Sequence, residues 1–241
     1  MKKSVLFATL LLAAGSLLAR DLKDDITGAA KKLAEADNYS WHQSTENAGG
    51  GNNRGGGPVD GKIQKDGLTD LKITAGDNDI EVVIKGDKGA FNGEDGWTSF
   101  AEATQDNNGG GGGGRGMFLA RMGKNFKSPA TMIQDLTGKV KELKESDGAI
   151  SGDFTDEAAK ELLIPAFMRR GGGDGPEVSG AKGSVKFWLK DGSVVKFQTK
   201  MSGKVTFNGN ERDVDRTTTV EIKDVGATKV TIPEEAKKKL S

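Results

Sequence analysis

The stretch VKFWLKDGSVVKFQTKMSGKVTFNG, residues 185–209, decides the fold that we expect for this chain. Apolar and charged residues alternate along it, which is typical of β-strands with one face in a core and one face in water. The residues expected on the apolar face of the first two strands are Val185, Phe187, Leu189, Val195, Phe197, Thr199 and Met201. Val205 and Phe207 are expected to extend this face onto a third strand.

The turn inside this stretch sets which residues face one another. A two-residue Asp191-Gly192 turn, continued without interruption, places Lys196 opposite the aromatic ring of Phe187. A three-residue loop over 190–192 instead pairs Phe187 with Val195 and puts the glycine at the left-handed position of a bulged turn. We therefore expect the three-residue loop.

Helical patterns stand apart from most of the strand patterns. One apolar stripe covers residues 20–36, a second covers 128–143 behind Ser128 as N-cap, and a third begins at Thr155 and ends at Pro165. Short strand-like pieces with dense turn signals, the last of them WTSFAEA, fill residues 38–103. This order predicts an α+β fold: a strongly curved, mainly antiparallel sheet of eight to ten strands, with three or four helices on its concave face.

The N-terminus has the layout of a secretory signal peptide. Two lysines precede an apolar run that ends near Ala19, and charged residues follow at once. A retained anchor is the alternative, but the run is shorter than the roughly 20 residues that span a bilayer. We expect cleavage after residue 19, no transmembrane segment in the mature chain, and a location in the periplasm or outside the cell.

Composition excludes several classes of function. The 35 basic and 35 acidic residues balance, so no overall charge attracts nucleic acid or an anionic membrane. The absence of cysteine rules out disulfides and thiolate chemistry. An exported chain of this kind must rely on its hydrophobic core for stability.

Three glycine-rich tracts interrupt the pattern, at 49–57, 109–116 and 171–175. Glycine has high chain entropy and no side chain to bury, so we expect exposed loops. The segments between the tracts do not look self-sufficient. We therefore interpret residues 20–241 as a single domain with three loop insertions.

The order of the motifs resembles a known family. ADNYSWHQST (36–45), VVIKGDKGAFNGEDGWTSF (82–100), GDFTDEAAKELL (152–163), KFWLKDGSVVKFQTKMSGKV (186–205) and DVGATKVTIPEEAKKKL (224–240) follow one another as in exported proteins of the lipoprotein-carrier (LolA-like) superfamily. The resemblance implies a half-barrel sheet closed by helices. Some members of the superfamily hold acyl chains between sheet and helices. The long glycine tracts depart from the carriers, and no functional residue of theirs matches a position here.

Other motifs have ordinary structural readings. His42 is the single histidine and has no partner set for zinc or for a catalytic triad. The glycines at 109–114 match a dinucleotide motif only because any glycine run does, and the arginines beside glycines are expected in solvated loops. The acidic groups at 77–81 and 211–215 raise a calcium site as an alternative to charged sheet faces.

We therefore expect a non-enzymatic exported protein without cofactor or metal, whose partner is a lipid or acyl chain, or an envelope protein. The alternatives are a structural or interaction protein without a ligand cavity and, third, an enzyme. Trp188 lies on the face opposite Phe187, where it either lies under a helix or contacts a partner. The predicted ligand-binding residues are Phe187, Leu189, Val195, Phe197, Met201 and Phe207.

Overall fold

The computed structural model describes residues 21–48, 57–76, 78–93, 96–105, 113–164 and 176–240. The predicted signal peptide (1–19) lies outside these residues. So do the glycine tract at 171–175, the tract at 49–57 apart from its last residue, and the first four residues of the tract at 109–116.

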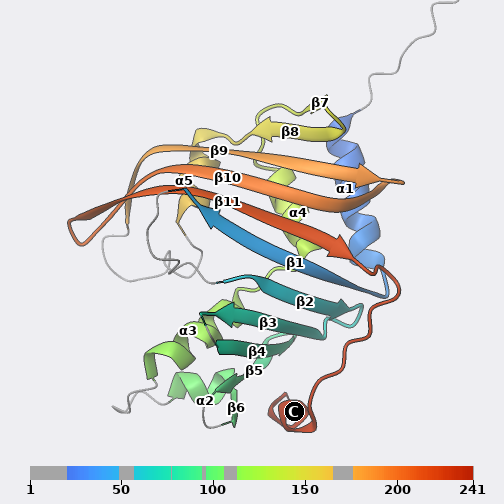
Figure 1. Cartoon of the computed structure of the whole chain (residues 1–241), viewed down its shortest axis with the longest axis vertical. Coiled ribbons are helices and arrows are strands. Elements are labelled where there is room, and N and C mark those ends of the chain that lie inside the picture. Colours follow the sequence, from blue (N-terminus) through green and yellow to red (C-terminus); the bar gives the residue numbers. More distant parts are fainter. Residues whose placement is uncertain are drawn as a thin grey trace, which may run out of the picture.

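Eleven antiparallel strands form one continuous sheet (Figure 1). The strands are β1 (Asn38–Asn47), β2 (Val59–Gln64), β3 (Thr69–Ala75), β4 (Asn78–Lys85), β5 (Lys88–Gly93), β6 (Gly96–Ser99), β7 (Lys144–Ser146), β8 (Ala149–Asp153), β9 (Glu177–Lys190), β10 (Ser193–Phe207) and β11 (Asn210–Lys223). Their order is β6-β5-β4-β3-β2-β1-β11-β10-β9-β8-β7, so β6 and β7 are the two edges and the sheet does not close on itself.

Six helices accompany the sheet in the described part of the chain. They are α1 (Leu22–Glu35), α2 (Phe100–Gln105), α3 (Gly113–Lys124), α4 (Pro129–Thr137), α5 (Asp156–Leu163) and α6 (Glu234–Lys239). Helices α1 and α5 contact β9 and β10, α4 packs on α1, and α2 and α3 contact β5. Figure 1 shows these helices behind the sheet. We call the sheet face that they cover the inner face and the opposite face the outer face. The predicted α+β fold is confirmed, but the sheet has eleven strands where eight to ten were expected, and the described residues form six helices where three or four were expected.

The predicted helix starts are confirmed by their caps. The side chain of Ser128 accepts a hydrogen bond from the backbone N–H of Thr131 at 3.3 Å, and Pro129 occupies the first turn of α4. The hydroxyl of Thr155 accepts from the N–H of Ala158 at 3.1 Å at the start of α5. Each cap satisfies one of the backbone donors that a helix start leaves without an intrahelical partner.

The helix predicted over residues 128–143 is wrong in its second half. Helix α4 ends at Thr137, and Gly138 caps it. Val140 then forms an isolated antiparallel bridge with Phe154, and the N–H of Lys141 donates to the carbonyl of Asp153 at 2.9 Å. The apolar residues after the glycine therefore lie on extended chain, where they still pack against the core.

The strand predicted for WTSFAEA is also wrong beyond its first residues. Ser99 and Glu102 form a capping box: the N–H of Ser99 donates to the Glu102 carboxylate at 2.7 Å, and the N–H of Glu102 donates to the Ser99 hydroxyl at 3.2 Å. Helix α2 begins at Phe100 as a result. Residues 113–116, which we expect in a loop, form the first turn of α3.

The register predicted for the β9–β10 hairpin is wrong, and a bulge is the reason. Asp191 and Gly192 have φ values of 52° and 68°, as a two-residue type I′ turn requires, and Lys190 pairs with Ser193. The register then shifts between Val194 and Lys196, which brings Phe197 opposite Phe187. The bulge thus keeps the aromatic side chains together without the three-residue loop. Val205 and Phe207 also lie on β10 itself and not on a third strand.

The C-terminal segment packs on the outer face. Adjacent strand residues point to opposite faces, so Val82 lies in the main core while Val83 lies in a second cluster on the other side. The buried members of this second cluster are Val83, Ala90, Val230, Ile232 and Ala236. Figure 1 shows the C-terminus in front of the sheet, opposite the other helices. No described helix has the length and hydropathy needed to cross a membrane.

Candidate functional site

The structure distributes the six predicted ligand-binding residues over three environments. Phe187, Phe197 and Met201 are 0%, 1% and 3% exposed. Leu189 is half-buried against the same core. Val195 and Phe207 are 37% and 55% exposed, so the six residues differ in burial. Val194, which the sequence interpretation left out, is buried in the core in place of Val195 because of the bulge.

The middle of the inner face is closely packed. The rings of Phe187 and Phe197 have centroids 6.4 Å apart and are tilted by 37°. A side chain without exposed surface borders no space that even a water molecule could enter. The packing leaves no room for a larger residue at Gly183, because a Cβ there would lie 2.4 Å from the sulfur of Met201. Around these residues, the space that a carrier would keep open is filled by protein side chains.

The inner face continues beyond the packed region along the three long strands. In the register of β10, Val205 lies opposite Val178, and Gly203 lies opposite Val214. The three valines are half-buried and pack against the edge of the main core. Phe207 follows on the same face at the end of the hairpin. We call Val178, Val205, Val214 and Phe207 the open end. Among the described helices, α5 contacts β9 and β10 and reaches the border of this region, where Leu163 lies against Gly203.

An arginine marks the border between the packed region and the open end. The Arg216 guanidinium donates to the carbonyl of Leu162 at 2.8 Å, near the C-terminus of α5. Arg216 lies opposite Met201, and Arg212 lies opposite Val205 on the same inner face. Arg212 is exposed and forms no ion pair with the described residues. The open end therefore combines apolar side chains with guanidinium groups.

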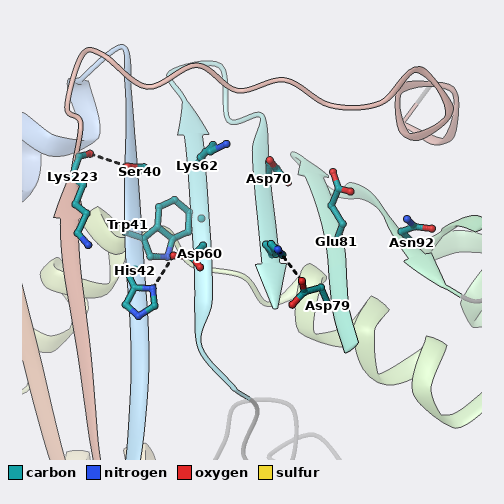
Figure 2. Close-up of a pocket in the computed structure, with 12 residues that line it drawn as sticks. Ser40, Trp41, His42, Asp60, Lys62, Asp70, Asp79, Glu81, Asn92 and Lys223 are labelled. Carbon is teal, nitrogen blue, oxygen red and sulfur yellow. Dashed lines mark hydrogen bonds and ion pairs between the residues drawn. The ribbon is translucent and has the colours of Figure 1, made fainter. Parts of the chain in front are cut away.

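A polar hollow of about 600 Å³ lies on the outer face over β1 to β4 (Figure 2). His42 on β1 contacts the carboxylate of Asp60 on β2, with Nδ1 and Oδ1 2.7 Å apart. The ammonium of Lys72 is 2.8 Å from the Asp79 carboxylate. Side chains of opposite charge alternate across these strands, so most of the charge in the hollow is neutralised locally.

Two carboxyl groups in the hollow have shifted pKa values. Burial raises the pKa of Asp70, and nearby Lys62 opposes that shift. Burial also raises the pKa of Glu81, and the charge of Asp70 adds to the increase. Both groups lie on the outer face of neighbouring strands. Their ionisation therefore lowers the stability of the folded chain.

The remaining sequence candidates lie in ordinary surroundings. In the acidic groups considered for calcium, Asp79 pairs with Lys72 and Glu211 pairs with Lys204, while Asp77 lies outside the described residues. In the part of the chain that the structure describes, no three acidic or histidine side chains converge on a metal position.

The tryptophans divide between core and surface. Trp41 is 4% exposed and stacks on Phe126, with ring centroids 6.0 Å apart. Trp97 packs against the second cluster on the outer face. Trp188 is half-buried, and the ammonium of Lys196 lies 5.0 Å from the centre of its ring. The structure places Trp188 on the outer face, opposite Phe187, where a lysine side chain covers its ring.

Comparison with known proteins gives similarity of fold only. No protein-family model and no curated protein sequence matches the chain. Similar solved structures include LprF from Mycobacterium bovis, with 12% identity and a TM-score of 0.46 over 89% of this chain and 96% of that chain. The lipoprotein LppX from Mycobacterium tuberculosis has 11% identity and a TM-score of 0.44 over 88% and 97%. A LolA superfamily protein from Nitrosomonas europaea has 8% identity and a TM-score of 0.33 over 87% and 94%.

Proposed function

We propose that this chain is an exported, non-enzymatic protein that binds the apolar part of a lipid, such as an acyl chain, at the open end of its inner face. The observation that carries the proposal is the exposure of Phe207, 55%, beside the half-buried Val178, Val205 and Val214. Apolar surface that adjoins a core and stays in contact with water gains free energy when a ligand covers it.

The position of the open end suits an elongated apolar ligand. Its residues lie on β9, β10 and β11, which all extend past α5, and the register keeps them on one face. Bulges at Gly203 and around Gly180, both with positive φ, change the course of these strands there. Arg212 on the same face supplies a positive charge for an acidic head group.

Export is supported by the lysine-led apolar run at residues 1–19. The proposal assigns no chemical step to the protein. His42 hydrogen-bonds to Asp60 on the neighbouring strand, and the carboxylates of the polar hollow lie among lysines of the same surface. These contacts support a non-enzymatic role.

A second candidate function is an envelope interaction protein without a lipid ligand. The packing of Phe187 and Phe197 favours it, because a carrier with a preformed cavity between helices and sheet would leave these rings beside open space. In this case the open end would contact a protein partner.

The test is a titration of the purified full chain with a long-chain fatty acid that fluoresces on entering an apolar environment. Phe207→Ser should weaken binding about fivefold, since roughly half of a phenylalanine side chain would lose its apolar contact. Val225→Ser is the matched control: Val225 is 51% exposed but lies after β11, away from the open end. Its affinity should equal that of the parent.

Absence of binding to the parent chain would reject lipid binding and leave the interaction protein. Equal weakening by both substitutions would place the ligand elsewhere. Because both side chains are exposed, neither substitution should lower the melting temperature by more than about 2 °C.

A further inference from the structure

A group of lysines occupies the outer face of β9 and β10, opposite the packed core. Phe187 and Phe197 point inward, so the residues that alternate with them point outward. The register places Trp188 beside Lys196, Lys186 beside Gln198 and Ser184 beside Lys200. We call this group the lysine patch, and its members are Lys182, Lys186, Lys190, Lys196 and Lys200.

The lysine patch lacks the counter-charges that several other lysines of the sheet have. Lys72, Lys85 and Lys204 each lie within 3.1 Å of a carboxylate oxygen. Among the described residues, the five lysines of the patch form no ion pair, and four of them are exposed. Like charges on adjacent strands repel one another, so an external anion would stabilise this arrangement.

The surroundings of the patch limit its extent. On β11, Glu221 lies opposite Lys196 but pairs with Lys223 at 3.4 Å. Asp213 and Asp215 lie on the outer face opposite Lys204 and Ser202, at the far end of the strands. Between these acids, β11 presents Thr217 and Thr219 to the patch. On the other side, β8 places Ser151 opposite Lys186 and Asp153 opposite Ser184. The charge of Asp153 also acts on Lys141, outside the patch. The positive region is therefore centred on Trp188, between Asp153 on β8 and the acids on β11.

The shape of the patch fits a surface more than a small anion. The lysines lie on a two-stranded sheet segment, with alternate residues roughly 6–7 Å apart along each strand. The indole of Trp188 lies at its centre, half-buried under Lys196. Tryptophan favours the boundary between lipid head groups and water, where its ring is partly apolar and its N–H is solvated.

We propose that the lysine patch docks the protein on a membrane surface rich in anionic lipid head groups. The balanced charge of the whole chain does not oppose this, because attraction to a charged bilayer acts within about 10 Å and depends on the local face. Docking through the outer face leaves the open end, on the inner face, accessible. The proposal does not depend on lipid binding at the open end.

The experiment measures co-sedimentation of the full chain with vesicles of equimolar phosphatidylcholine and phosphatidylglycerol, and with vesicles of phosphatidylcholine alone. The parent should bind the anionic vesicles at 20 mM salt and should be released at 300 mM salt. A variant with Lys182, Lys186, Lys196 and Lys200 replaced by glutamine should bind at least tenfold more weakly, since each lysine near an anionic bilayer contributes roughly fivefold.

The matched control removes the same charge from other places. A variant with Lys23, Lys88, Lys124 and Lys229 replaced by glutamine has the same net charge, and these exposed lysines form no ion pair with the described residues. Its vesicle affinity should stay within twofold of the parent. Thermal melting of both variants checks that the fold is intact.

Three results would overturn the proposal. The first is equal binding of the parent to both kinds of vesicle. The second is equal weakening in the two four-lysine variants, which would indicate an effect of net charge alone. The third is binding to a soluble polyanion such as heparin without binding to anionic vesicles. A loss of fatty-acid binding in Phe207→Ser with unchanged docking would separate the two proposals.

Discussion

Replacement of Phe197 by alanine tests whether the middle of the inner face is a core. The side chain is 1% exposed, lies against the ring of Phe187, and belongs to the cluster that α1 and α5 cover. Removing a buried phenyl ring loses its transfer free energy and leaves a void that the neighbours fill only in part. Such substitutions cost about 3–5 kcal/mol. We therefore expect Phe197→Ala to lower the free energy of unfolding by this amount.

Urea unfolding followed by circular dichroism measures the difference, with an unchanged dependence on urea concentration. Phe207→Ala is the matched control, because the same side chain is removed where it is 55% exposed, and we expect a loss below about 1 kcal/mol. If Phe197→Ala costs only about 1–2 kcal/mol, the ring already borders open space. The assignment of a packed core would then be refuted, and a ligand cavity at this position would be restored.

Four further substitutions test the local arguments. Gly28→Ala should stabilise the chain by about 0.5–1 kcal/mol, because nothing lies within 4 Å of the added Cβ on α1. Gly61→Ala should destabilise it by about 1–3 kcal/mol, because that Cβ would lie 2.1 Å from the ring of Trp41. In urea unfolding, a destabilising Gly28→Ala or a stabilising Gly61→Ala would refute the corresponding argument. The hydrogen bond from Lys239, with those from Ser99, lowers the pKa of Glu102 to about 2, so its carboxylate stabilises the fold above about pH 4.5 and loses this effect as the pH falls through 2. Glu102→Gln should therefore lower the melting temperature at pH 7 and have a much smaller effect at pH 2. Burial raises the pKa of Asp70, so its ionised carboxylate destabilises the fold at neutral pH. Asp70→Asn should therefore raise the melting temperature at pH 7 and have no effect below pH 3.8. A decrease at pH 7 would contradict the burial argument.

The class of fold was predictable because alternation and helical periodicity both report burial directly. Val185, Phe187 and Phe197 are buried as the alternation in residues 185–209 predicts. The caps at Ser128 and Thr155 were predictable for a similar reason, since they depend on neighbouring residues only.

The errors come from features that need the tertiary structure. A bulge at Val195 changes the pairing without any glycine or proline to indicate it. Helix α4 ends at Thr137, before its cap Gly138, although the apolar spacing continues, because Val140 gains a strand partner in Phe154. The capping box at Ser99 and Glu102 was visible in the sequence as S-x-x-E and could have located α2.

The candidate site was only partly predictable, because an apolar face has the same sequence pattern whether protein or ligand covers it. Helix α5 ends near Leu163, and the strands continue past it. This difference in length separates the packed Phe197 from the exposed Phe207, although both were expected on one apolar face. The lysine patch has a visible alternating pattern, but its lack of ion pairs depends on the residues that neighbouring strands present.

The open end is proposed to hold a lipid. The most direct test purifies the full chain from the cells that make it, extracts the bound lipids and identifies them by mass spectrometry. We predict a long-chain lipid in the parent and in Val225→Ser at close to one molecule per chain, and a clearly lower amount in Phe207→Ser. A parent that carries no lipid, or equal lipid in all three proteins, would contradict the claim.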